Sequence, residues 1–200
     1  MRTFIVQQLR PAVMLLILLT LITGVAYPGI VTAIGQVAFP SQANGSFITV
    51  NGAQVGSSLI GQAFSDPKYF WGRPSAAGVT TANPAGYDGT SSGGSNLGPT
   101  SKALIDRISA SVDQLRQANG NGPVPVELVT TSASGLDPDI SPAAAEYQVA
   151  RVATARGLTP DAVRAIVARH TTQPLFGFIG EPVVNVLELN LDLDGLLTTK

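Results

Sequence analysis

The chain has 200 residues, a formal net charge of −1, and charged residues at only 12% of its positions. This composition provides no basic surface for phosphate backbones, which excludes a nucleic-acid-binding protein. Cysteine is absent, which excludes a disulfide scaffold, a lipid-anchored cysteine and a thiolate metal site.

The N-terminal part of the chain is apolar and uncharged. No charged residue occurs in residues 11–65, and twelve of residues 12–34 are Leu, Ile or Val. As an α-helix, residues 12–34 would be about 35 Å long, enough to cross a hydrocarbon core of about 30 Å. The sequence therefore predicts a transmembrane helix over residues 12–34. Tyr27 would lie at the membrane interface, and Pro28-Gly29 would kink or end the helix.

A cleaved signal peptide is the alternative interpretation of the same stretch. Arg2 and Arg10 would be its charged start, and Gly24-Val25-Ala26 its cleavage site. The apolar pattern continues beyond that site through residues 30–37, as expected for an uncleaved anchor. Both interpretations place the N-terminus in the cytoplasm and the rest outside, because the next cation after Arg10 is Lys68.

These features predict four parts of the chain and its fold class. They are a cytoplasmic N-terminus (residues 1–11), the transmembrane helix (12–34), a linker (35–45) and one extracytoplasmic domain (46–200). The last part is long enough to enclose a hydrophobic core. We expect an α+β fold, in which helices pack on a small, mostly antiparallel sheet. The protein would be a single-pass protein of the inner membrane.

The domain is predicted to begin with a β-hairpin. Residues 47–50 and 53–55 are two short runs that flank Asn51-Gly52. An Asn-Gly pair favours the two positive φ angles of a type I′ turn, which predicts two antiparallel strands.

Aromatic residues are concentrated after the hairpin. Four of the twelve aromatic residues lie between Phe64 and Trp71, close to Arg73. They could form a binding platform, because aromatic and arginine side chains dominate protein interfaces, or they could be core residues under an irregular loop. The candidates here for contact with a partner or a nucleotide are Gln62, Tyr69, Phe70 and Arg73.

A glycine-rich loop then precedes a predicted helix. Residues 76–100 are mostly small, and a loop of this length is usually functional or disordered. The loop leads into a helix predicted from Pro99 to about Gln117, as in a phosphate-binding turn. The G-x-x-x-x-G-K-[ST] motif is absent, so packing against a partner is the preferred interpretation. The candidate residues in this loop are Ser92, Gly93, Gly94, Ser95 and Asn96.

The C-terminal half alternates between predicted strands and helices. We expect a strand over residues 126–131, a turn at Asp137-Pro138-Asp139, and two helices over 141–156 and 159–170. The two helices resemble a helix-turn-helix in outline, but their charges nearly balance, which favours a hairpin packed on a sheet. From Leu187 the apolar and polar residues alternate, which predicts a final strand.

Sequence motifs of enzymes are not found. The G-x-S-x-G and H-E-x-x-H patterns are absent, and the single histidine, His170, cannot supply a multi-histidine metal site. A hydrolase that uses His170 is a minor alternative. We therefore assign no catalytic residue, no metal ligand and no bound cofactor.

Several distinctive motifs follow one another along the chain. They include Leu59-Ile60-Gly61-Gln62, Tyr69-Phe70, Gly72-Arg73-Pro74-Ser75, Tyr87-Asp88, Ser92-Gly93-Gly94-Ser95-Asn96, Gly135-Leu136-Asp137-Pro138, Tyr147-Gln148-Val149, Gly180-Glu181-Pro182 and Val184-Asn185-Val186-Leu187. In this order the motifs resemble the KdpC family, the small subunit of the bacterial Kdp potassium-transporting P-type ATPase. Ala133 and Asp139 depart from the family pattern, in which Gly and His are usual, so position 139 is assigned no role.

The resemblance implies a non-catalytic accessory subunit of a complex that imports K⁺ at the expense of ATP. The implied partners are a channel-like K⁺-binding subunit, the P-type ATPase subunit and a very small hydrophobic subunit, with ATP and K⁺ handled by the complex. The family is also described as a catalytic chaperone that raises the ATP affinity of the ATPase subunit. Charge asymmetry places the candidate residues outside, whereas ATP is inside, so we favour assembly or stabilisation of the channel-like subunit. The alternative is a membrane-anchored extracytoplasmic module that binds a ligand.

Overall fold

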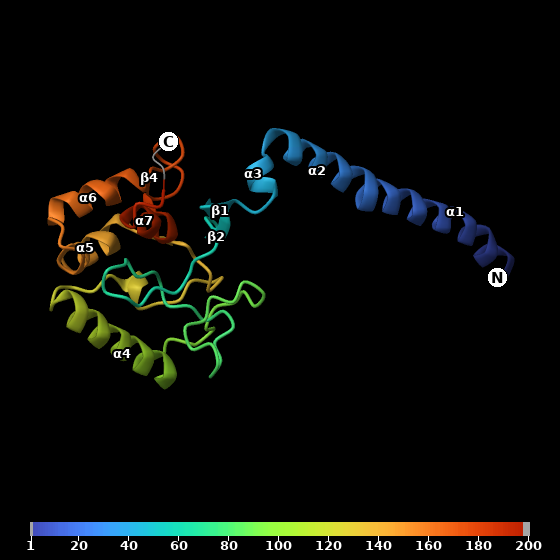
Figure 1. The fold of residues 1–200 in the computed structure, drawn as a ribbon. Helices are drawn as coiled ribbons and strands as arrows, with labels where there is room; N and C mark the ends of the chain where they lie inside the picture. The colour runs from blue at the N-terminus through green and yellow to red at the C-terminus, as the bar shows by residue number, and fades with distance from the viewer. Residues whose placement is uncertain (1, 198–200) are drawn as a thin grey trace. The chain divides into compact units, whose positions relative to one another are not determined.

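The computed structural model describes residues 2–197 of the chain. Met1 of the predicted N-terminal segment and residues 198–200 of the predicted domain therefore lie outside the described residues. The chain divides into two compact units, Met1–Phe47 and Ile48–Lys200, and Figure 1 follows their elements in order.

The first unit is dominated by one long helix. Helix α1 (Arg2–Leu21), a π-helical turn (Ile22–Ala26) and α2 (Tyr27–Ala38) follow one another without a break. From Gln7 to Ala38 this helix is long and apolar enough to cross a membrane. The prediction that Pro28-Gly29 could end the helix is wrong. The amide of Tyr27 donates to the carbonyl of Ile22, and this wider turn accommodates the ring and the missing N–H of Pro28.

The predicted linker over residues 35–45 is largely helical. Helix α2 continues to Ala38, and the short α3 (Pro40–Ala43) follows. The Asn44 side chain donates to the carbonyl of Pro40 at 2.7 Å and to Oε1 of Gln36 at 3.0 Å. These bonds tie the turn after α3 back to the end of the long helix.

The predicted β-hairpin is present at the start of the second unit. Strands β1 (Phe47–Val50) and β2 (Ala53–Ser57) pair with each other. Asn51 and Gly52 have φ angles of 50° and 82°, which match a type I′ turn.

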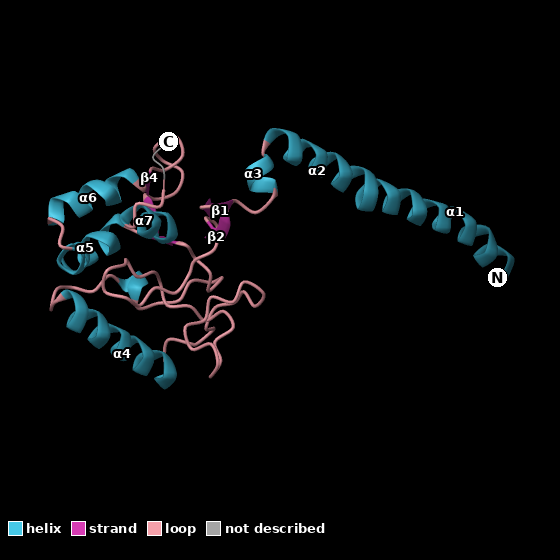
Figure 2. Cartoon of the chain, in the orientation of Figure 1, coloured by secondary structure: helices cyan, strands magenta, loops and turns pink. Residues whose placement is uncertain are grey.

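A long irregular segment connects the hairpin to the first helix of the second unit. Residues 58–101 contain no helix or strand, and Figure 2 draws this path as loop. Helix α4 (Lys102–Asn119) begins after Ser101, three residues later than the predicted start at Pro99. Leu115 is buried in this helix, whereas Ile105 is 56% exposed.

Helices α5 (Pro142–Arg156) and α6 (Pro160–Arg169) confirm the predicted helical pair. The hydroxyls of Ser141 and Thr159 each accept the backbone N–H three residues later, at 3.2 Å, as N-caps do. Gly157 ends α5 with a φ of 66°, a conformation that glycine adopts without strain.

A three-stranded antiparallel sheet lies in this unit. Strands β3 (Asp139–Ile140), β4 (Thr171–Thr172) and β5 (Val183–Asn185) have the order β3-β5-β4. Val184, in the central strand, faces Ile140 on one side and Thr171 on the other. The second unit therefore has the predicted α+β character, with helices and small antiparallel sheets.

Two predicted strands are wrong. Residues 126–131 contain a 3₁₀ turn (Val126–Leu128), because a short apolar run does not distinguish a strand from other buried structure. Residues 186–193 form helix α7 (Val186–Leu193), which is capped by Asn185. The alternating pattern suggested that Asn190 would face solvent, but Asn190 is 1% exposed. A helix buried on several sides can thus carry apolar residues at alternate positions.

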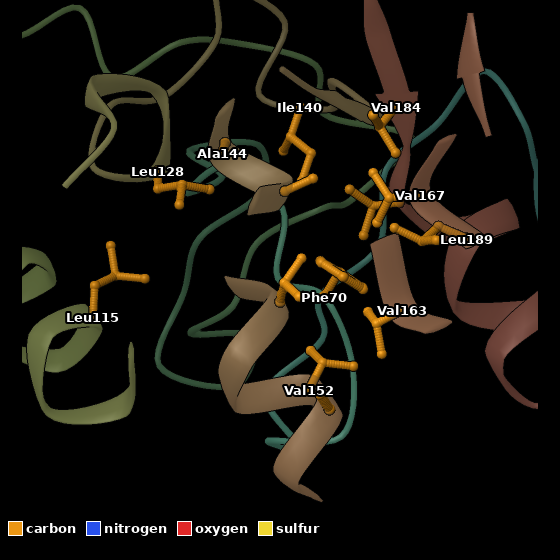
Figure 3. Packing of buried hydrophobic residues seen from close by; sticks show 14 of the residues in the cluster. Phe70, Leu115, Leu128, Ile140, Ala144, Val152, Val163, Val167, Val184 and Leu189 are labelled. Carbon is orange, nitrogen blue, oxygen red and sulfur yellow. The ribbon is translucent and has the colours of Figure 1, made fainter. Parts of the chain in front are cut away.

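One hydrophobic core joins the helices and the sheet of the second unit. Figure 3 shows Phe70 among side chains of α5, α6 and α7, including Val152, Val163 and Leu189. The buried members of the core are Phe70, Leu115, Leu128, Val129, Ile140, Ala144, Ala145, Val149, Val152, Ala153, Val163, Val167, Val184, Val186 and Leu189.

Candidate functional site

Two side-chain amides hold the aromatic segment against the helices. In α7, Asn190 accepts the N–H of Phe70 at 2.8 Å and donates to its carbonyl at 3.0 Å. In α5, Gln148 forms the same pair of bonds with Trp71, at 2.8 and 3.0 Å. Phe70 is fully buried, so this predicted contact residue belongs to the core. Sequence reasoning missed the roles of Gln148 and Asn190, because partners so distant along the chain leave no local pattern.

Arg151 of α5 reinforces the same segment from inside the domain. Its guanidinium donates to the carbonyls of Pro67 and Tyr69 at 2.6 and 2.9 Å, and lies 4.0 Å from the centre of the Trp71 ring. The side chain is only 8% exposed. Burial lowers the pKa of Arg151 to about 10, although the carboxylate of Asp66 acts in the opposite direction. This arginine is thus engaged by the domain itself.

Tyr69 connects the aromatic segment to the end of α7. Its hydroxyl donates to the carboxylate of Asp194 at 2.7 Å, and Arg156 donates to the other oxygen of that carboxylate at 2.8 Å. The bond to Asp194 raises the pKa of Tyr69, and partial burial adds to this effect. The hydroxyl of Tyr69 is thus bonded within the domain, and its side chain is half-buried.

Arg73 joins the segment to the turn before β3. Its guanidinium pairs with the carboxylate of Asp137 at 3.0 Å and donates to the carbonyl of Thr131 at 3.4 Å. The backbone carbonyl of Arg73 accepts the hydroxyl of Tyr87. Burial and the nearby Asp137 carboxylate raise the pKa of Tyr87 to about 12, although Arg73 opposes this change.

A small cleft lies between this segment and α4. Its volume is about 250 Å³. It brings together two predicted residues, Gln62 and Arg73, whereas Tyr69 and Phe70 are not among its lining residues. Tyr87, Ser111 and Gln114 also line it and were not among the predicted contact residues.

Glycines allow the close packing around Tyr87. A Cβ atom at Gly61 would lie 2.6 Å from the Tyr87 ring, and one at Gly72 would lie 3.0 Å from its hydroxyl. In the sequence, the motifs that contain Gly61 and Gly72 could have indicated a closely packed neighbour, but they did not identify Tyr87 as that neighbour.

The predicted glycine-rich loop packs on another part of the chain. The N–H of Gly93 and the hydroxyl of Ser92 both donate to the carbonyl of Ser134, at 2.8 and 3.1 Å. Thr131 donates to the Ser95 hydroxyl at 3.4 Å. Gly94 lies against the backbone of residues 132–133, and the exposed Asn96 has a φ of 52°. None of the five candidate residues of this loop lines the cleft beside α4, so the structure does not unite the two predicted sets.

The arginines of α6 and the neighbouring His170 bond with carboxylates. Arg164 bonds with Glu146 at 2.7 Å and with Asp161 at 2.8 Å. Arg169 and His170 share the carboxylate of Asp192, each at 2.9 Å. Burial raises the pKa of Asp192, but the bonds from Arg169 and His170 outweigh it and lower the pKa overall. The predicted helix-terminal His170 is thus tied to α7.

The long apolar helix and the α+β unit are the features of a membrane-anchored protein with one globular domain. Residues 9–195 match the family model described as K⁺-transporting ATPase, c chain (KdpC). The chain belongs to this KdpC family, so it is a subunit of a K⁺-transporting ATPase.

Relatives named potassium-transporting ATPase KdpC subunit are similar over nearly their whole length. The protein of Sorangium cellulosum is 59% identical over 189 residues, which cover 94% of this chain and 97% of the relative. That of Burkholderia orbicola is 57% identical over 188 residues, covering 93% and 95%. That of Rhodopseudomonas palustris is 55% identical over 196 residues, covering 94% and 98%.

Proposed function

We propose that this chain is a non-catalytic accessory subunit that assembles and stabilises an ATP-driven potassium importer. Its partners would be a channel-like K⁺-binding subunit, a P-type ATPase subunit that hydrolyses ATP, and a very small hydrophobic subunit. The second unit would contact the channel-like subunit from the extracytoplasmic side. The distribution of charge supports this orientation, because Arg2 and Arg10 are the only cations before Lys68.

The packing of the glycine-rich loop is the observation that favours assembly over nucleotide handling. The Gly93 amide, which a phosphate would need, is bonded to the Ser134 carbonyl at 2.8 Å. At the start of α4, Lys102 is paired with Asp106 at 2.6 Å. A phosphate site would need the Gly93 N–H and the Lys102 ammonium to be available, but both are bonded to other groups of the chain. The catalytic-chaperone role is therefore the less favoured alternative for this loop.

The ligand-binding module is also less well supported. The cleft beside α4, which brings together the predicted contact residues Gln62 and Arg73, has a volume of about 250 Å³. Sites for small molecules are typically about 300–1,000 Å³. Saturable binding of a small molecule by the full-length chain would restore this hypothesis.

Co-purification tests the assembly role. The tagged, full-length chain would be expressed with the other subunits under K⁺ limitation and purified in mild detergent. We expect stoichiometric recovery of the channel-like and ATPase subunits, and loss of their association when this chain is omitted. Recovery of an equally stable and active complex without the chain would overturn the proposal.

The nucleotide alternative is tested by adding one negative charge to the glycine-rich loop. Asn96→Asp would repel a bound triphosphate but would keep a residue type that tolerates its φ of 52°. Asn51→Asp is the matched control, because Asn51 is exposed and has a φ of 50°. We expect both variant complexes to retain the wild-type KM for ATP within about twofold. A tenfold rise in KM for Asn96→Asp alone would favour nucleotide contact.

A further inference from the structure

An apolar tip protrudes between β4 and β5 of the second unit. We define it as residues 175–179. Apart from Gly177, every residue of the tip is a largely exposed apolar residue: Leu175 at 61%, Phe176 at 78%, Phe178 at 75% and Ile179 at 52%. Single exposed apolar residues are ordinary, but adjacent ones on one turn indicate a contact surface.

The backbone of the tip is closed on itself. Leu175 and Ile179 exchange N–H···O bonds of 3.1 and 3.0 Å, and the Phe178 N–H donates to the Leu175 carbonyl at 3.3 Å. Phe176 and Gly177 form the turn with φ angles of 54° and 78°. Positive φ is unfavourable for phenylalanine, and such strain is often found at functional positions. The turn presents the rings of Phe176 and Phe178, whose centres are 6.4 Å apart.

The tip also lacks charge. Residues 171–180 contain no Asp, Glu, Lys, Arg or His, and the first charged residue after them is Glu181. Paired backbone groups, exposed apolar side chains and the absence of charge are the properties required of a segment that enters a membrane interface.

We propose that this apolar tip inserts into the interface of the lipid bilayer that holds the N-terminal helix. Only nine residues (39–47) separate the end of α2 from the second unit. Even fully extended, they reach about 30 Å, so the second unit stays close to the membrane surface. Such tethering raises the effective concentration of the tip at the lipid, which allows a weak apolar contact to form. The tip would then restrict how the second unit can turn on its tether.

Depth-dependent fluorescence quenching tests this insertion in the full-length chain. Because the chain has no cysteine, one introduced cysteine can be labelled selectively. Phe178→Cys would be labelled with an environment-sensitive fluorophore and reconstituted into phosphatidylcholine vesicles that contain spin-labelled lipid. Val126→Cys is the matched control, because Val126 is also apolar and is 72% exposed but lies outside the tip. We expect at least threefold stronger quenching at position 178 and a blue-shifted emission.

Two results would overturn the proposal. Equal, weak quenching at positions 178 and 126 would place the tip in water. A blue shift that occurs without lipid quenching, and only when the other ATPase subunits are present, would make the tip a docking site for protein. Ile179→Cys provides a second label position in case the first disturbs the turn, since Ile179 is 52% exposed.

Discussion

At the scale of single residues, buried polar side chains determine where the irregular segment lies. Gln148 is completely buried, and its amide satisfies both backbone groups of Trp71. Its Oε1 also accepts a bond of 2.7 Å from Arg151. A buried backbone group without a partner destabilises the folded state by about 1–3 kcal/mol. These side chains therefore substitute for the missing strand partners of the segment.

Replacement of Gln148 tests this role. Gln148→Leu preserves size and helix propensity but leaves the N–H and carbonyl of Trp71 unbonded. We expect the free energy of unfolding to fall by about 2–4 kcal/mol, measured by urea denaturation of the full-length chain in mild detergent. Gln117→Leu, at an exposed position of α4, should change it by less than about 0.5 kcal/mol. Equal effects of the two substitutions would contradict the argument.

Tyr87 predicts a specific response to alkaline pH. Its pKa is raised from 10.0 to about 12 in the folded chain, chiefly by burial. Between these pH values the unfolded chain loses the phenolic proton while the folded chain retains it, so stability falls as the pH rises. Below about pH 10 this contribution is fully present. The free energy of unfolding should therefore decline less steeply from pH 10 to 12 in Tyr87→Phe than in the wild type, and parallel declines would argue against a buried phenol.

At the scale of elements, the irregular segments pack against one another through close backbone contacts. A Cβ atom at Gly135 would lie 2.5 Å from the Gly93 carbonyl oxygen and 2.8 Å from the Ala77 nitrogen. Three stretches of chain thus meet at one glycine. This meeting point positions the glycine-rich loop without any helix or strand.

Two glycines with the same backbone conformation separate strain from crowding. Gly135 and Gly157 have φ angles of 67° and 66°, but a Cβ atom at Gly157 would have no neighbour within 4 Å. Gly157→Ala should lower the free energy of unfolding by about 1 kcal/mol, the cost of the left-handed conformation. Gly135→Ala should lower it by about 3 kcal/mol or more, because backbone must also move. Thermal unfolding of both variants measures the difference. Similar decreases in the free energy of unfolding would show that the backbone around Gly135 can move at little cost.

Local signals explain which elements were predictable. The caps Ser141 and Thr159 and the Asn51-Gly52 turn act on neighbouring residues, so the sequence revealed α5, α6 and the hairpin. Helix α7 was mistaken for a strand because the burial of Asn190 depends on Phe70, 120 residues away. The cleft was predicted only in part for the same reason, since Gln62 and Arg73 lie in two neighbouring motifs while Ser111 and Gln114 come from a distant helix.

At the scale of the whole molecule, the long apolar helix and the buried core belong to different units. Among the described residues, the members of the buried core cluster lie between Phe70 and Leu189, outside the first unit. The second unit therefore contains the interactions that stabilise it. The first unit contributes the long apolar helix.

Removal of residues 1–47 tests this division. We expect the remaining chain to be soluble and to unfold within a few degrees of the full-length protein, as measured by circular dichroism, because its core is intact. Its affinity for the other ATPase subunits should fall by about 100-fold or more, because the effective concentration provided by the anchor is lost. Retention of wild-type affinity in a pull-down titration would show that the anchor contributes little to assembly.

The distance along the chain between partners also sets an order of events during synthesis. Phe70 and Trp71 are made 120 and 77 residues before the Asn190 and Gln148 side chains that bond them. At about 5–20 residues per second, a ribosome needs about 6–24 s to cover the longer interval. The aromatic segment must wait unfolded for that time, exposed to aggregation and proteolysis. The domain can therefore complete its folding only after helix α7 has been synthesised. A nascent chain that stops before α7 lacks Asn190, and the backbone of Phe70 then has no side-chain partner in α7.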